Sequence, residues 1–276
     1  MADWRTPTRT SAVRPVASSF VGKYRKLQHE RGWAWSLAVP ILKPILLATT
    51  KQNWIGGEKI PATGGAIIAL NHVSHADPVT AAHLVWDYGR ESRYLAKSSL
   101  FKNAQFGKFM RAAGQIPVDR AAGADAFKHA VEAVNAGEIV VVYIEGSITK
   151  DPDGWPMVGK SGAARIALAT GAPVIPVGQW GAQELLPAYS KKPNLKGRKT
   201  ITMRVGDPVP LEDLRAQEAT TDVIREATDR IMDAIVGLVE EIRGEKAPAE
   251  RFDPRKHGLR STGNPNARAD GSKADG

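Results

Sequence analysis

Short apolar runs alternate with amphipathic segments along most of the chain. The most apolar run is EIVVVYI at residues 138–144, and an earlier run, AIIAL, occupies residues 66–70. Short apolar runs bounded by turn residues predict buried strands. Further strands of this kind are expected at 92–97, 114–120, 172–177 and 199–206, with a strand and turn at 53–61.

Segments with an apolar stripe of helical period lie between these strands. The longest is residues 220–243, where one face carries Val223, Ala227, Ile231, Ile235, Leu238 and Ile242. Shorter helices are expected after Pro78 and at 102–113, 124–136 and 161–170. Strands that alternate with helices predict an α/β fold with a mostly parallel central sheet flanked by helices.

The segment at residues 33–52 breaks this alternation. It begins WAWSLAVPILKPILLATT, which is strongly apolar but contains two prolines and Lys43. A helix that spans a bilayer needs about 20 apolar residues and tolerates a central lysine poorly. We therefore expect an N-terminal membrane motif of one or two short interfacial helices, with Trp33 and Trp35 at headgroup level. A proline-kinked helix of a soluble core is the alternative.

Composition and charge favour an anionic partner. The 276 residues carry a formal net charge of +9 and no cysteine, which excludes disulfides and thiolate metal sites. The positive charge favours an anionic membrane surface or a phosphorylated substrate. No nucleic acid is expected, because no motif of a nucleic-acid-binding fold accompanies the charge. The expected organisation is a basic mobile arm (1–32), an interfacial helical segment (33–52), an α/β domain (53–243) and a disordered tail (244–276).

The stretch NHVSHADP, residues 71–78, joins the first buried strand to the next helix. In open α/β sheets, chemistry is found at such strand ends. His72 and Asp77 would face different ways in one regular helix, so they can meet only if His72 lies in the loop before it. A capping box of Ser74 with Asp77, or Asp77 as N-cap before a proline, supports such a helix start. An aspartate bonded to one imidazole nitrogen leaves the other nitrogen as a base.

Two other interpretations compete with this one. Asp77 could merely cap the helix, with His72 as a polar loop residue. A metal site would use His72, His75 and Asp77, but their spacing matches no common zinc signature, so no metal is expected. The chain also lacks a G-x-S-x-G motif, so a familiar serine or cysteine acyl-enzyme has no support.

Polar residues also follow two later strands. Arg120 ends GQIPVDR, and Glu145 and Gly146 directly follow the run at 138–144. In a parallel sheet these strand ends meet at the rim that carries His72. An arginine there could bind a phosphate through two hydrogen bonds, and a glycine would let a ligand approach the backbone closely. A paired surface arginine and an ordinary Glu-Gly turn are the simpler alternatives.

A competing signal is GWPMVGKS, residues 154–161, which matches the phosphate-binding loop G-x-x-x-x-G-K-[ST]. Its context is unfavourable, because a polar segment separates it from the preceding strand. Pro156 also has no N–H to offer a phosphate, and Trp155 is bulky where the backbone must wrap closely. Nucleotide hydrolysis is therefore the weaker hypothesis.

The order of these motifs resembles that of the glycerolipid acyltransferases, the family of lysophosphatidate (1-acylglycerol-3-phosphate) acyltransferases. NHVSHADP, GQIPVDR, YIEGS and APVIPV correspond to its four blocks. The resemblance implies a role for each matched residue. By this resemblance His72 would be the general base and Asp77 would orient it. Arg120 would bind a phosphate, and Glu145 and Gly146 would bind the acceptor. Pro176 would lie on the side of the acyl donor.

The third block departs from the family pattern. It usually reads Phe-Pro-Glu-Gly-Thr-Arg-Ser, whereas this chain has YIEGSIT, with Ile148 in place of the arginine. Lys97, Lys150 or Lys160 could replace the missing phosphate contact, although a lysine is a point charge and not a planar fork. The difference bears on the identity of the acceptor more than on the reaction.

The resemblance implies transfer of a fatty acyl group from acyl-CoA or acyl carrier protein to the hydroxyl of lysophosphatidate. The product would be phosphatidate, made for phospholipid synthesis, and acyl-CoA would be a co-substrate with no other cofactor. We expect a peripheral or monotopic protein on the cytoplasmic face of a membrane. The alternatives are another acceptor (glycerol 3-phosphate, another lysophospholipid or a glycolipid) and a catalytically silent lipid-binding module.

Overall fold

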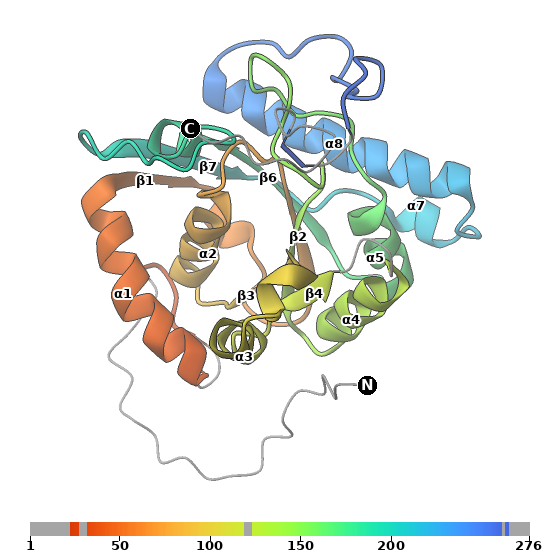
Figure 1. Ribbon diagram of the computed structural model, residues 1–276. Helices are drawn as coiled ribbons and strands as arrows, with labels where there is room; N and C mark the ends of the chain where they lie inside the picture. The colour runs from red at the N-terminus through yellow and green to blue at the C-terminus, as the bar shows by residue number, and fades with distance from the viewer. Residues whose placement is uncertain (1–22, 28–31, 119–122, 261–262, 265–276) are drawn as a thin grey trace.

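A seven-stranded sheet organises the chain in the computed structural model, which describes residues 23–27, 32–118, 123–260 and 263–264. The strand order is β1-β7-β6-β2-β5-β3-β4 (Figure 1). Neighbouring strands are parallel except for the antiparallel pair β6–β7, so the predicted mostly parallel sheet is confirmed. The strands are β1 (Thr50–Ile55), β2 (Ala66–Leu70), β3 (Ser92–Lys97), β4 (Ile116–Val118), β5 (Ile139–Tyr143), β6 (Val174–Trp180) and β7 (Lys199–Val205).

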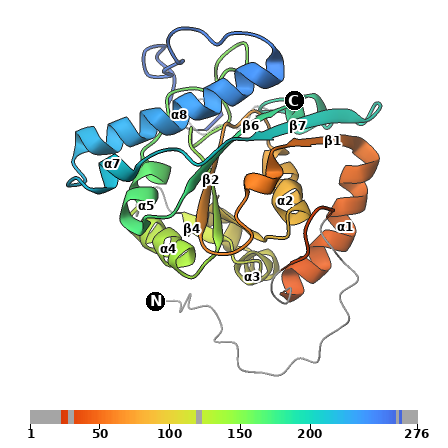
Figure 2. The same ribbon diagram turned by 180° about the vertical axis from the view of Figure 1, so that it is seen from behind.

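Helices cover both faces of this sheet (Figures 1 and 2), as an α/β fold requires. On one face lie α4, α5 and α8, and on the other lies α2, with α1 against α2 and α3 against α1. The helices are α1 (Trp33–Thr49), α2 (Asp77–Asp87), α3 (Ala104–Ala112), α4 (Gly123–Asn135), α5 (Gly162–Thr170), α6 (Ala182–Leu185), α7 (Glu212–Arg215) and α8 (Thr221–Arg243), with short 3₁₀ turns at Gly57–Lys59 and Ser98–Phe101.

The central strand β2 is buried on both faces, which explains its continuous apolar sequence. Ile67 and Ala69 belong to the core under α4, α5 and α8, whereas Ile68 and Leu70 belong to the core under α2. This division follows from the two-residue side-chain period of a strand. The central strands therefore read as uninterrupted apolar runs instead of alternating with polar residues.

Helix α1 is one continuous helix, although it contains two prolines. Its central lysine, Lys43, donates to Asp87 Oδ1 at 2.7 Å, and Asp87 is almost fully buried. Trp54 Nε1 donates to the other oxygen of Asp87 at 3.1 Å. The lysine that interrupts the apolar segment therefore attaches α1 to the C-terminal end of α2. The predicted helical segment ended at residue 52, whereas the structure ends the helix at Thr49 and begins β1 directly after it.

Parts of the two terminal segments pack against the domain, which differs from the sequence prediction. In the predicted mobile arm, Tyr24 stacks on Tyr88 with ring centroids 4.9 Å apart. In the predicted disordered tail, residues 244–260 have a defined path, and the backbone of Phe252 accepts a hydrogen bond from Val158 N at 3.0 Å. Composition indicated polar, Pro-rich segments, but it could not show which surfaces of the domain would bind them.

Candidate active site

His72 and Asp77 meet at the C-terminal end of β2, as the sequence predicted. His72 Nδ1 lies 2.7 Å from Asp77 Oδ2, and the same oxygen accepts the backbone N–H groups of Val73 (2.7 Å) and Ser74 (2.8 Å). Asp77 is fully buried, whereas 14% of the His72 side chain is exposed. A carboxylate at Nδ1 favours the tautomer protonated there, which leaves the lone pair of Nε2 available as a base.

The start of α2 differs in detail from both predicted caps. The helix begins at Asp77, and the Asp77 carboxylate reaches back to the loop as in a capping box. Ser74 Oγ, however, accepts from Ala76 N at 3.0 Å and donates to Leu186 O at 2.6 Å. The serine therefore ties the loop to a distant part of the chain, while the aspartate serves the histidine.

Glu145 joins the His72 loop to the loop after β5. Its Oε1 accepts from His72 N and its Oε2 from Met157 N, both at 2.8 Å, and only 1% of the residue is exposed. Burial raises the pKa of Glu145 to about 8, although the two N–H donors act in the opposite direction. Thr149 N also donates to His72 O at 2.7 Å. Both backbone polar groups of His72 are therefore fixed by residues that follow β5.

Asn71 and Gln179 join the ends of β2 and β6 in a pairing that the sequence analysis missed. Asn71 Nδ2 donates to Gln179 O at 3.0 Å, Gln179 N to Asn71 Oδ1 at 2.9 Å, and Gln179 Nε2 to Asn71 O at 2.6 Å. All of these atoms are buried, where hydrogen bonds are costly to lose. These three hydrogen bonds fix Asn71, the residue directly before His72. No local pattern predicts them, because the partners lie 108 residues apart.

An aromatic ring supports the imidazole of His72. Tyr143, the last residue of β5, stacks on His72 with centroids 4.2 Å apart and an interplanar angle of 25°. Tyr94 stacks in turn on Tyr143, with centroids 6.2 Å apart. Burial raises the pKa of Tyr143 well above its ordinary value, so the phenol stays neutral. Leu70 of β2 pairs with Tyr143 of β5, and this pairing places the Tyr143 ring beside the His72 loop. The sequence alone does not determine the register of these two strands.

Among the predicted cationic and glycine positions, Lys97 and Gly146 lie at or just after the carboxyl ends of the neighbouring strands β3 and β5. Gly146 has φ +71°, a left-handed conformation that favours glycine, and the outer atoms of the Lys160 side chain lie within 3.0 Å of where a Cβ would stand. Lys97 is exposed at the end of β3. Arg120 lies outside the described residues. Ile148, which takes the place of the family's arginine, is buried at 2% exposure.

The loop at residues 154–161 does not offer its backbone to a phosphate. Trp155 N donates to Asp151 Oδ1 at 3.0 Å, and Lys160 N donates to Ile144 O at 2.8 Å. The backbone N–H groups of residues 154, 157 and 158 also donate to oxygens of the protein. A phosphate-binding loop needs its N–H groups unoccupied and convergent, so the match to that motif is a coincidence of sequence.

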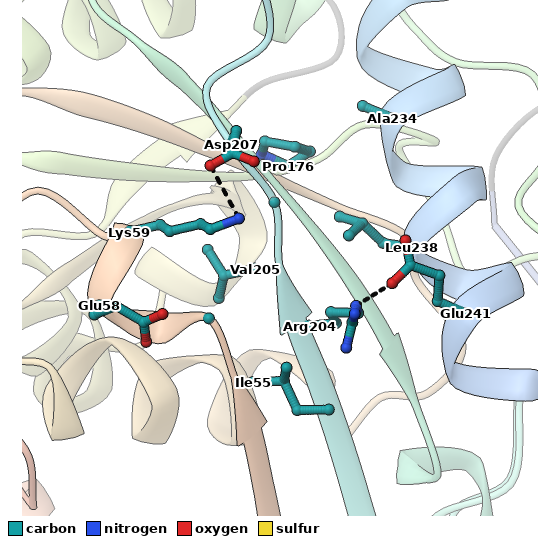
Figure 3. A pocket seen from close by; sticks show the side chains of 12 residues that line it. Ile55, Glu58, Lys59, Pro176, Arg204, Val205, Asp207, Ala234, Leu238 and Glu241 are labelled. Atoms are coloured by element: carbon teal, nitrogen blue, oxygen red, sulfur yellow. Dashed lines mark ion pairs between the residues drawn. The ribbon is translucent and has the colours of Figure 1, made fainter.

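A hollow of about 430 Å³ lies away from these residues, between α8 and strands β1, β6 and β7 (Figure 3). Pro176 lines it, and an ion pair of Lys59 with Asp207 (2.9 Å) stands at its edge. His72 is not among its lining residues. The hollow is thus separate from the His72 rim.

Comparisons with known proteins point to one protein family. The Acyltransferase family model matches residues 52–180. The 1-acyl-sn-glycerol-3-phosphate acyltransferase of Bacillus subtilis (strain 168) is 30% identical over 173 residues, which are 62% of this chain and 80% of that protein. The chloroplastic 1-acyl-sn-glycerol-3-phosphate acyltransferase BAT2 of Brassica napus is 29% identical over 145 residues, 51% of this chain and 40% of that protein.

A solved structure shares the fold. The crystal structure of the 1-acyl-sn-glycerophosphate (LPA) acyltransferase PlsC from Thermotoga maritima aligns with a TM-score of 0.57 at 22% identity, covering 77% of this chain and 81% of that one. This likeness supports the α/β architecture, and the Bacillus relative supports the family. The chain is therefore an acyltransferase that belongs to the 1-acyl-sn-glycerol-3-phosphate acyltransferase family.

Proposed function

We propose that this acyltransferase moves a fatty acyl group from acyl-CoA to the free hydroxyl of lysophosphatidate, with His72 as general base. The observation that carries the proposal is the hydrogen bond between His72 Nδ1 and the Asp77 carboxylate, whose atoms lie 2.7 Å apart. It leaves Nε2 as a proton acceptor beside a partly exposed rim. A module that only binds lipid has no need of a buried carboxylate aimed at a partly exposed imidazole.

In the proposed reaction, His72 Nε2 takes the proton of the acceptor hydroxyl while the oxygen attacks the thioester carbonyl carbon. The resulting imidazolium is stabilised by the buried Asp77. The tetrahedral adduct then breaks its carbon–sulfur bond, and the CoA thiolate recovers the proton from His72. The rest of the acceleration comes from holding both substrates in line with Nε2.

For the acceptor, we propose that its phosphate lies near the cationic side chains of the rim. Lys160, beside Gly146, and Lys97, at the end of β3, are the described candidates, and Arg120 is a third. Glu145 is a poor candidate for direct acceptor contact, because both of its oxygens accept backbone N–H groups inside the protein. We assign Glu145 a positioning role, since it holds His72 N.

We also propose that α1 docks the rim on an anionic membrane surface on the cytoplasmic side. Trp33, Leu37, Ile41 and Ile45 form a stripe at four-residue spacing, each with 53–54% exposure. Such an exposed apolar stripe suits the boundary between headgroups and acyl chains. Trp35 is less exposed, because it stacks on Trp86 with centroids 6.0 Å apart. Within the described residues, no helix has the length and apolar content that crossing a bilayer requires.

The experiment that tests this function measures thiol release from palmitoyl-CoA by the purified protein with each of several acceptors. A thiol reagent reports CoA without protein background, because the chain has no cysteine. Release that requires lysophosphatidate and yields phosphatidate supports the proposal. Release with glycerol 3-phosphate or a glycolipid instead would change the acceptor. Vesicle binding without release from acyl-CoA or acyl carrier protein would favour the lipid-binding module.

A further inference from the structure

The segment after α8, residues 244–260, turns back beside that helix (Figure 1) and reaches the loop at residues 149–158. We call this segment the C-terminal strap. It lies outside the residues that the Acyltransferase family model matches. The loop at residues 149–158 that it reaches lies within the matched range.

The strap is held on α8 by charged contacts. Arg251 donates to Asp229 Oδ1 at 3.1 Å and also pairs with Asp233, one helical turn further on. Ala247 N donates to Glu240 Oε1 at 2.9 Å. Only 21% of the Arg251 side chain is exposed, so this arginine is the main side-chain link between the middle of the strap and the helix.

The strap is also bonded to the loop at 149–158. Phe252 O accepts from Val158 N at 3.0 Å, and Arg260 O accepts from Lys150 Nζ. The loop also has hydrogen bonds of its own, such as Thr149 Oγ1 to Trp155 O at 2.7 Å. Contacts from outside the loop lower its tendency to open locally still further. The strap is thus bonded to the loop at two separate residues, Lys150 and Val158.

Each of these two residues is adjacent to a residue that fixes His72. Lys150 follows Thr149, whose N–H donates to His72 O at 2.7 Å. Val158 follows Met157, whose N–H holds Glu145, and Glu145 in turn accepts from His72 N at 2.8 Å.

From this adjacency we infer that the C-terminal strap positions His72 through the loop at 149–158. The strap touches no reacting atom in this inference; it limits the motion of the loop that holds the histidine backbone. The kinetic part of the inference depends on the function proposed above for His72, whereas the effect on loop motion does not.

The test reverses one charge of the strap. Arg251→Glu faces Asp229 and Asp233 and repels the strap from α8. Lys256→Glu makes a matched change on an exposed strap residue, whose only ion pair in the described part of the chain is a 3.4 Å contact with Glu250. Hydrogen exchange of the amides at 149–158 is measured in both full-length variants, together with kcat and KM.

In Arg251→Glu, exchange at 149–158 is expected to accelerate on the order of tenfold. The value of kcat is expected to fall by a similar factor, with KM for either substrate changed by less than about twofold. Lys256→Glu is expected to change neither. Adding Asp233→Arg to Arg251→Glu restores an ion pair of opposite polarity and should recover both properties.

Unchanged exchange at 149–158 in Arg251→Glu would overturn the inference, whatever the activity. Faster exchange with unchanged kcat would overturn the link to His72 and leave the strap a stabilising element alone. If the wild-type protein transferred no acyl group at all, the failure would lie with the proposed function, and hydrogen exchange would still decide whether the strap restrains the loop.

Discussion

His72 Nδ1 and Asp77 Oδ2 lie 2.7 Å apart, and two backbone N–H groups of the same loop donate to that oxygen. The carboxylate is thus bonded both to the imidazole and to the loop that carries it. Because Asp77 is fully buried, its charge acts on the imidazole with little screening by water. Orientation and charge stabilisation at His72 therefore come from one side chain.

Asp77→Asn separates these two contributions. The amide keeps an oxygen for the loop N–H groups, so the variant should fold, but it carries no charge to stabilise an imidazolium. We expect kcat to fall by roughly 10²–10⁴-fold with KM little changed. Steady-state kinetics and circular dichroism check both points. Near-full activity in a folded variant would mean that Asp77 only caps α2.

Tyr143 offers a test of the ring that supports His72. Tyr143→Phe keeps the stacked ring and should retain activity within about threefold, whereas Tyr143→Leu removes it and should lower kcat by roughly tenfold. Equal loss in both variants would instead assign the effect to the hydroxyl, which lies beside Gln179. Measurements of kcat at several pH values distinguish a displaced base from a changed pKa of His72.

Glu145 predicts a pH dependence of stability. Burial raises its pKa from 4.5 to about 8, so the folded state holds a proton that the unfolded state releases. The resulting stabilisation is complete below pH 4.5 and is lost as the pH rises through about 8, by at most ~5 kcal/mol. In Glu145→Gln this dependence should disappear. Urea unfolding of both proteins between pH 4.5 and 8.5 measures the difference.

Two histidines give stability the opposite pH dependence, in the wild type and in Glu145→Gln alike. Burial lowers the pKa of His75 and of His83, so their contribution is lost as the pH falls through their ordinary range. The comparison of wild type with Glu145→Gln cancels their effect. A pH slope that is identical in the two proteins would show that Glu145 titrates normally in the folded state.

The exposed stripe of α1 predicts membrane binding. Ile41→Glu places a charge in the middle of the stripe, where 53% of the isoleucine is exposed. We expect binding to phosphatidylglycerol vesicles to weaken on the order of tenfold, as loss of one buried aliphatic side chain implies. Ala219→Glu, in the exposed turn before α8, adds the same charge as a control. Equal sedimentation of both variants with vesicles would exclude α1 as the docking surface.

The sequence predicted the fold well where local pattern decides it. The buried strands β2 and β5, the long amphipathic α8 and the loop that carries His72 were all expected from periodicity and spacing. The antiparallel pairing of β7 with β6 was not expected, because pairing direction depends on contacts between distant segments.

The site was predicted less completely. His72 and Asp77 are five residues apart, so loop geometry could bring them together in advance. Asn71 with Gln179, and Tyr143 under His72, depend on strand register and could not be predicted. Glu145 was expected to face the acceptor, whereas its oxygens bind backbone N–H groups, and this orientation depends on the loop after β5.

The most direct measurement compares acceptor-dependent thiol release from palmitoyl-CoA by wild type and by His72→Ala. The wild-type protein should release CoA only when lysophosphatidate is present. His72→Ala should lose this release by at least about 10³-fold while keeping the wild-type circular dichroism spectrum. A folded His72→Ala protein that still released CoA at a near wild-type rate would contradict the assignment of His72 as the general base.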